Sequence, residues 1–211
     1  MKPTIYTLTG PSGVGKSTLI SQAEARSAAR QACSVTTRAL RDADDRRIPV
    51  TMDTFLEMEQ SGQLIESIFY DGNAYGISRS VVLRILEEGL PALLDCNESG
   101  VKQTIASGVA PVTTIFLVAD AQTLYERQMS RGAGTLSSRI RRLKQALEEI
   151  DGIDSGLYHH VIRNDSLPDA TAKLLGILNG EPVPSDPFDV DRFKRELGTL
   201  IDTLEASAAH L

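Results

Sequence analysis

The sequence predicts an α/β fold of three layers, αβα, around a parallel central sheet. Short apolar runs alternate with longer helical patterns, and this alternation is typical of a parallel sheet covered on both faces. A glycine-rich turn joins the first run to the first helical pattern. At 211 residues the chain is long enough for one such domain with a small insertion.

Each element of the alternation can be placed on the chain. Residues 4–9, 92–94 and 113–118 are short apolar runs typical of buried strands. Helical patterns follow them, and turn or capping residues mark their ends. Their expected limits are residues 17–30, Ser78 to Gly89, Asp120 to about Arg131, and a helix that Pro168 begins.

Two regions interrupt this alternation. Residues 38–77 are polar, with one short helix expected at 55–59, and they predict a small inserted subdomain of irregular structure. Residues 131–139 are rich in glycine and basic, as in a mobile flap. After Gly180 a proline-rich linker leads to an amphipathic helix, which either packs on its own domain or pairs with a second subunit as a homodimer. Its apolar stripe is Phe193, Leu197, Leu200, Ile201 and Leu204.

Composition excludes several classes of function. The formal net charge of −6 argues against general binding to nucleic acid or an anionic membrane. No apolar run approaches the roughly 20 residues that span a bilayer. The two cysteines, Cys33 and Cys96, have no metal-ligand spacing and form no disulfide framework. We therefore expect a cytoplasmic protein whose partners are small molecules.

The strongest motif is Gly10-Pro-Ser-Gly-Val-Gly-Lys-Ser-Thr18, which matches the P-loop pattern G-x-x-x-x-G-K-S of NTPases. Glycines let the backbone wrap around phosphate oxygens, and the following helix adds its positive dipole end. Lys16 is expected to reach the β- and γ-phosphates of ATP, and the Ser17 hydroxyl to ligate Mg²⁺. The expected ATP-binding residues are Ser12, Gly13, Val14, Gly15, Lys16, Ser17 and Thr18.

A kinase also needs a site for its acceptor. If the acceptor group is itself a phosphate, arginine side chains are expected to bind it. Arg38 and Arg41 are three residues apart, beside a hydroxyl-rich run that begins at Ser34. Together with further motifs, this element resembles the guanylate kinase family over nearly all of residues 4–178. The other shared motifs are Gly72-Asn-Ala-Tyr-Gly-Ile-Ser78, Leu94-Asp95, the pair Arg131 and Arg142, and Ile162-Arg-Asn-Asp165.

The resemblance implies a guanylate kinase-like domain over residues 1–180, with an acceptor-binding subdomain at about 36–90, a lid at about 131–142, and a separate tail at 181–211. Lys16, Arg131 and Arg142 would act on the transferring phosphoryl group, and Asn164 would lie near the adenine of ATP. The implied acceptor-binding residues are Ser34, Arg38, Arg41, Glu66, Tyr75, Asp95 and Asn97.

The chain departs from the family at positions that read the guanine base. Family members place an acid six residues before the tyrosine that corresponds to Tyr75, where this chain has Phe69, and another where it has Asn97. These departures predict intact phosphate transfer with altered guanine recognition.

Three functions therefore stay open. The first is phosphorylation of a nucleoside monophosphate, GMP or dGMP. The second is phosphorylation of a sugar phosphate, as in the ribose 1,5-bisphosphate phosphokinases. The shortened loop between Arg38 and Phe55 resembles the corresponding loop of those enzymes. The third is a non-catalytic binding module, against which the complete P-loop argues.

Overall fold

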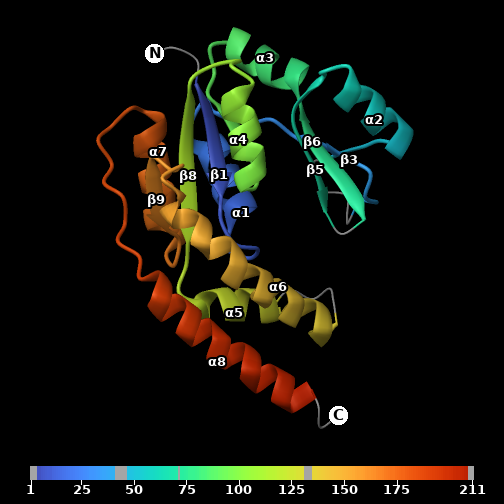
Figure 1. The fold of residues 1–211 in the computed structure, drawn as a ribbon. Coiled ribbons are helices and arrows are strands. Elements are labelled where there is room, and N and C mark those ends of the chain that lie inside the picture. Colours follow the sequence, from blue (N-terminus) through green and yellow to red (C-terminus); the bar gives the residue numbers. More distant parts are fainter. Residues whose placement is uncertain (1–3, 41–46, 71, 131–134, 209–211) are drawn as a thin grey trace. The chain divides into compact units, whose positions relative to one another are not determined.

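The computed structural model describes residues 4–40, 47–70, 72–130 and 135–208. Figure 1 shows their helices and strands, coloured along the sequence. They divide into two compact units. The first unit takes its residues from Met1–Leu8 and Glu24–Thr114, and the second from Thr9–Ala23 and Ile115–Leu211. The expected division at residue 180 stays a prediction.

The first unit contains three parallel strands. β1 (Ile5–Thr9) and β2 (Arg30–Gln31) both pair in parallel with β7 (Ala92–Asp95). The side chains of Ile5, Leu93 and Leu94 are fully buried, as expected for strands covered on both faces. The predicted strands at 4–9 and 92–94 are thus confirmed.

A second, four-stranded sheet in this unit has the order β4-β3-β6-β5. The prediction of an irregular insertion was wrong here, because much of residues 38–77 is regular structure. A turn at Gly72, with φ of 75°, joins the two longest strands of this sheet. The strands are β3 (Ser34–Thr36), β4 (Ile48–Pro49), β5 (Leu64–Tyr70) and β6 (Asn73–Ser78).

Helices α2 (Met52–Gln60) and α4 (Glu98–Ala106) both contact β5, and α3 (Arg79–Glu87) contacts β6 and β7. The first helix, α1 (Lys16–Arg26), is shorter than expected. The Glu24 carboxylate accepts a hydrogen bond from the Gln31 amide, and Arg30 already belongs to β2, so the chain leaves the helix before residue 30.

The second unit contains the parallel pair β8 (Val112–Val118) and β9 (His160–Arg163), although the first residues of β8 belong to the first unit. The predicted strand at 113–118 and the helices after Asp120 and near Pro168 are confirmed. The helices are α5 (Ala121–Ser130), α6 (Leu136–Glu149), a 3₁₀ turn (Ile150–Ser155), α7 (Leu167–Leu178) and α8 (Val190–Ala208).

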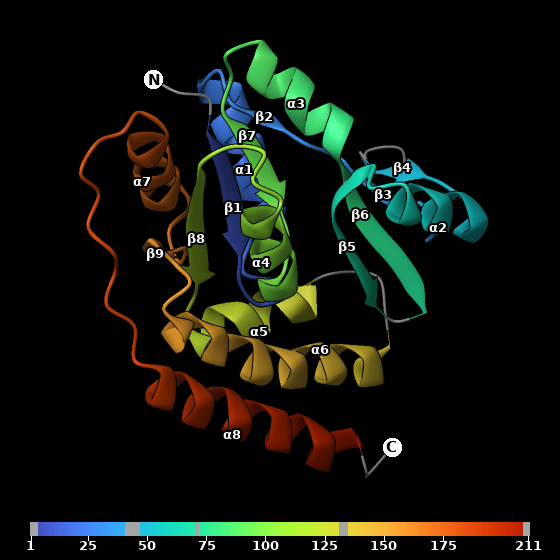
Figure 2. The ribbon, with the colours of Figure 1, turned by 45° about the horizontal axis from the view of Figure 1, so that its top comes forward.

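The last helix, α8, packs within its own unit along α5 and α6 (Figure 2). Phe193, Leu197 and Ile201 are buried on it, as its apolar stripe predicts. Lys144 of α6 forms an ion pair with Glu205 of α8 at 2.8 Å. The apolar stripe is therefore covered by the chain itself, and pairing with a second subunit stays a prediction.

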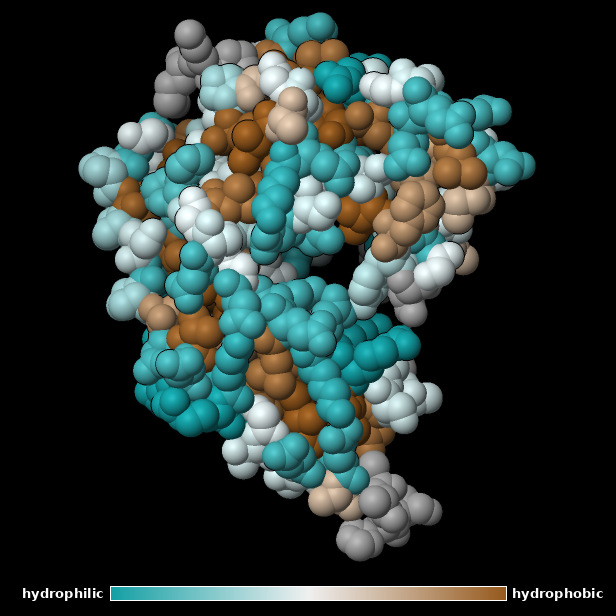
Figure 3. All heavy atoms as spheres, in the orientation of Figure 1, coloured by the Kyte–Doolittle hydropathy of each residue, from teal (hydrophilic) through white to brown (hydrophobic). Residues whose placement is uncertain are grey.

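Hydrophilic side chains cover much of the face seen in Figure 3, and apolar side chains reach it in patches. Among the described residues, no helix combines the length and the apolar character that crossing a membrane requires.

Candidate active site

The P-loop follows β1 directly and leads into α1, as its motif predicts. Gly10, Gly13 and Gly15 have φ of 141°, 94° and 101°. A Cβ on Gly15 would lie 2.5 Å from Asn164 Nδ2, and one on Gly10 would lie 2.3 Å from the Leu117 carbonyl oxygen. Both the backbone conformation and the close neighbours therefore require glycine at these positions.

Side chains from outside the loop hold its carbonyl groups. Arg127 Nη1 donates to the Val14 carbonyl at 3.1 Å, and Asn164 Nδ2 donates to the same oxygen at 2.7 Å. Arg127 Nη2 also donates to the Asn164 carbonyl at 2.8 Å. Gln128 Nε2 donates to the Ser12 carbonyl. Because these side chains bind the Ser12 and Val14 carbonyl groups, the backbone amides of the loop can bind anions.

The Lys16 side chain folds back onto the loop and binds its backbone. Its Nζ donates to the Gly10 carbonyl at 2.6 Å, which keeps the ammonium at the phosphate loop. The Ser12 amide donates to Glu149 Oε2 at 3.2 Å. Burial raises the pKa of Glu149, and the positive charge of Lys16 works in the opposite direction.

The start of α1 fits a magnesium ion. The Ser17 side chain there is exposed, and its hydroxyl oxygen is a hard ligand of the kind that Mg²⁺ takes. No group of three or more His, Cys, Asp or Glu side chains suited to a metal occurs in the part of the chain that the structure describes. This donor set fits an ion held by one side chain, phosphates and water rather than by a protein cage.

The sheet register brings predicted acceptor residues to one face of the β3-β6-β5 sheet. Ser34 lies opposite Ile77, and Ile77 lies opposite Glu66. Tyr75 lies opposite Ile68, which is two residues from Glu66 on β5. Since directly paired residues share a face and side chains alternate along a strand, Ser34, Glu66 and Tyr75 belong to the same face.

Glu66 is the most unusual residue of this face. Only 4% of its surface is exposed, and its Oε2 atom is buried without a hydrogen-bond partner. Burial, and secondarily the charge of Asp95, raises its pKa to about 7. A Cβ on Gly100 of α4 would lie 2.7 Å from Oε2, so the helix approaches closely only because residue 100 is glycine. Such an unpaired buried carboxylate is costly to the fold and is typical of a ligand site.

Comparison with known proteins decides the family. The family model described as guanylate kinase matches residues 2–181. The chain belongs to the guanylate kinase family. It is 35% identical over 179 residues to a guanylate kinase of Synechococcus sp. (strain JA-3-3Ab), covering 82% of this chain and 81% of the relative.

Further relatives agree. A guanylate kinase of Chromohalobacter salexigens is 30% identical over 184 residues, with 85% of each chain covered. The crystal structure of guanylate kinase from Anaplasma phagocytophilum has a TM-score of 0.65 and 25% sequence identity, covering 84% of this chain and 85% of that one. The predicted α/β fold and the predicted family are therefore confirmed.

Phe69, at which the sequence predicts altered base recognition, does not share the face of Glu66. It is three residues further along β5, and alternation places it on the opposite face. Its ring packs edge-on against Phe55 of α2, with centroids 5.8 Å apart, and 58% of the residue is exposed. The aromatic side chain thus belongs to the α2 side of the sheet.

The remaining predicted site residues lie at the ends of strands, on helices or outside the described residues. Asn97 caps α4: its Oδ1 accepts from the Gly100 amide at 2.9 Å. Asp95 ends β7. Arg38 follows β3 closely, and its amide donates to Thr36 Oγ1 at 3.1 Å. Arg41 and Arg131 lie outside the described residues, and Arg142 lies on α6.

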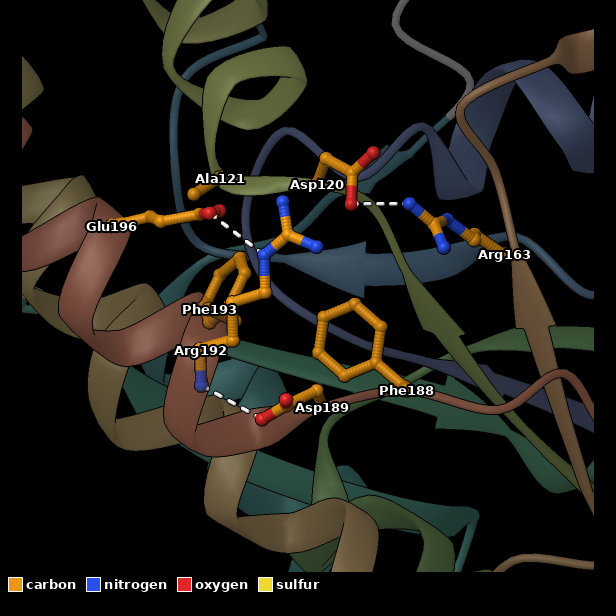
Figure 4. Close-up of a pocket in the computed structure, with 8 residues that line it drawn as sticks. All are labelled: Asp120, Ala121, Arg163, Phe188, Asp189, Arg192, Phe193 and Glu196. Carbon is orange, nitrogen blue, oxygen red and sulfur yellow. Dashed lines mark hydrogen bonds and ion pairs between the residues drawn. The ribbon is translucent and has the colours of Figure 1, made fainter.

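A small pocket in the second unit is a separate feature (Figure 4). Its volume of about 60 Å³ is well below that of sites for small molecules. Its charged groups are already paired: Arg163 with Asp120, and Arg192 with Glu196 at 2.8 Å. None of the predicted site residues that the structure describes lines it, so we do not assign it to the active site.

Proposed function

We propose that this chain is an ATP-dependent kinase that transfers the γ-phosphate of ATP to the phosphate of GMP. Membership of the guanylate kinase family supports this reaction and does not favour the ribose 1,5-bisphosphate kinase alternative. The structural observation that carries the assignment is Glu66, a buried carboxylate with an unpartnered oxygen near Asp95. Guanine presents N1–H and N2–H₂ donors, which an ionised carboxylate accepts.

In the proposed donor site, the P-loop amides bind the ATP phosphates. Lys16 exchanges the Gly10 carbonyl for phosphate oxygens, since its ammonium is already held at the loop. Ser17 would hold Mg²⁺, which neutralises phosphate charge when bound. Thr18 and the amides of residues 13–17 complete the proposed site. The proposed role of Asn164 toward adenine rests on the family resemblance, and its buried side chain also supports the loop through Val14.

In the proposed acceptor site, Arg38 and Arg41 bind the GMP phosphate together with Tyr75. Ser34 and Glu66 contact the base, and Asp95 adds a second carboxylate. Asn97 contributes chiefly as the cap of α4. An acceptor phosphate oxygen is already ionised, so the transfer requires no general base, only alignment and charge neutralisation. Arg131 and Arg142 supply positive charge to the transferring group.

The test is ADP formation from Mg·ATP with a panel of acceptors: GMP, dGMP, AMP, CMP, UMP and ribose 1,5-bisphosphate. We expect turnover with GMP and dGMP, and at least about a hundredfold lower kcat/KM with AMP, because adenine lacks donors where Glu66 accepts. Turnover with the sugar bisphosphate alone would contradict the proposal and restore the second function. ADP binding without turnover of any acceptor would instead favour a binding module.

A further inference from the structure

The peptide groups of Ser12 are held from both sides by side chains that the P-loop motif does not include. Its amide donates to Glu149 Oε2 at 3.2 Å, and its carbonyl accepts from Gln128 Nε2. Gln128 is fully buried on α5, and Glu149 is partly buried at the end of α6. Two different helices therefore meet the loop at one residue, immediately before Gly13.

Glu149 is itself held in place. Gln145 Nε2, one turn earlier on α6, donates to Glu149 Oε1 at 2.6 Å, while Oε2 receives the Ser12 amide. Arg142 lies seven residues before Glu149, close to two helical turns, so the two side chains stand on the same face of α6. The face of α6 that carries Arg142 is thus the face that contacts the phosphate loop.

We propose that Glu149 is a positioning residue for the phosphate loop and that it acts together with Gln128. Fixing the peptide groups on both sides of Ser12 sets the direction of the amides that follow, from Gly13 to Lys16. Because Glu149 ends α6, the same contact also fixes Arg142 relative to the loop. The inference rests on the proposed ATP site and adds to it two residues that no motif contains.

The contact also has a competing interpretation, which the experiment must separate. A carboxylate beside a loop that binds anions could be an obstacle to phosphate, in which case its removal would tighten nucleotide binding. We favour positioning because Glu149 and Gln128 hold the two peptide groups on either side of one residue, Ser12. Lys16 donates to Gly10 rather than to Glu149.

The test is the dissociation constant of Mg·ADP, measured by isothermal titration calorimetry, for wild type, Glu149→Ala, Glu149→Gln, Gln128→Ala and the Glu149→Ala/Gln128→Ala double variant. Glu149→Ala is expected to bind ADP about tenfold more weakly, the effect of losing a hydrogen bond to a charged group. Glu149→Gln retains an oxygen that accepts from Ser12 and is expected within about threefold of wild type. Glu148→Ala, an exposed neighbour on the same helix, is the matched control and should bind as wild type.

The double variant separates positioning from general stabilisation. If both side chains act through the backbone of Ser12, their combined loss is smaller than the product of the single losses, whereas independent effects multiply. Wild-type or tighter ADP binding by Glu149→Ala, equal losses in Glu149→Ala and Glu149→Gln, or independent effects would each overturn the proposal. Should Glu149→Ala not fold, Gln128→Leu, which keeps a similar buried volume and cannot donate to the Ser12 carbonyl, carries the test with the same expected tenfold loss, and wild-type ADP binding by it overturns the proposal.

Because ADP binding involves no acceptor, this experiment is independent of the choice of GMP. In turnover assays at saturating ATP, Glu149→Gln should leave the KM for GMP unchanged within about twofold, since the acceptor residues are not touched. A protein that binds ADP as expected but does not phosphorylate GMP contradicts the proposed function and leaves the role of Glu149 standing.

Discussion

Replacing Glu66 with glutamine should stabilise the protein at neutral and alkaline pH. Burial raises the pKa of Glu66 from its ordinary 4.5 to about 7. The unfolded chain therefore releases this proton at a lower pH than the folded protein does. The contribution of Glu66 to stability is complete below about pH 4.5, declines as the pH rises, and reaches its lower limit above about pH 7.

The magnitude follows from the same two values. The two pKa values, 4.5 and about 7, differ by about 2.5, and a difference of one corresponds to about 1.4 kcal/mol, so full ionisation of Glu66 lowers the free energy of unfolding by about 3–4 kcal/mol. Most of this loss, about 2–3 kcal/mol, falls between pH 5 and pH 8. Glutamine has nearly the same shape and does not ionise, so Glu66→Gln should escape that loss.

The assay is urea unfolding of wild type and Glu66→Gln at pH 5, 6, 7 and 8, with the difference in unfolding free energy taken at each pH. The difference should grow in favour of the variant as the pH rises. A constant difference across this range would refute the reasoning, because it would mean that the carboxyl group is not held protonated by burial.

Three further predictions concern the second unit. Lys16→Ala should lower kcat by at least about a hundredfold through loss of charge at the transferring phosphate, and a near-normal kcat would remove Lys16 from the site. Arg142→Ala should lower kcat with ADP affinity unchanged within about threefold, and an unchanged kcat would contradict its role. Gly15→Ala should destabilise the fold by about 1–3 kcal/mol in thermal unfolding and weaken ADP binding, since its φ is 101° and a Cβ would meet Asn164 at 2.5 Å; wild-type stability would contradict this.

Much of the fold could be predicted from local sequence. The strand at 4–9 and the P-loop were visible because apolar runs and glycine spacing are local signals. The strand β5 was missed because the charge at Glu66 interrupts the apolar pattern that identifies a strand, and β6 was missed because it contains Asn73 and Gly76, residue types that are rare in strands. The end of α1 was misplaced because the contact between Glu24 and Gln31 is not visible in propensity.

The site was predicted unevenly for a similar reason. Residues such as Lys16 stand in a motif, whereas Gln128 and Glu149 reach Ser12 across more than a hundred positions of sequence. The spacing of Arg142, Gln145 and Glu149 on one helical face is the signal that could have indicated them. The sequence alone could not show that Phe69 and Glu66 lie on opposite faces, because the face on which a residue lies depends on strand register, which is known only once β5 is paired with β6.

The central claim is that guanine is read on the face of the sheet that carries Glu66, and the KM for GMP in two variants tests it most directly. Glu66→Gln should raise this KM by about tenfold to a hundredfold, because a charged acceptor is replaced by a neutral amide. Phe69→Ala, on the opposite face, should change it by less than about threefold. An unchanged KM in Glu66→Gln, or a large increase confined to Phe69→Ala, would contradict the account.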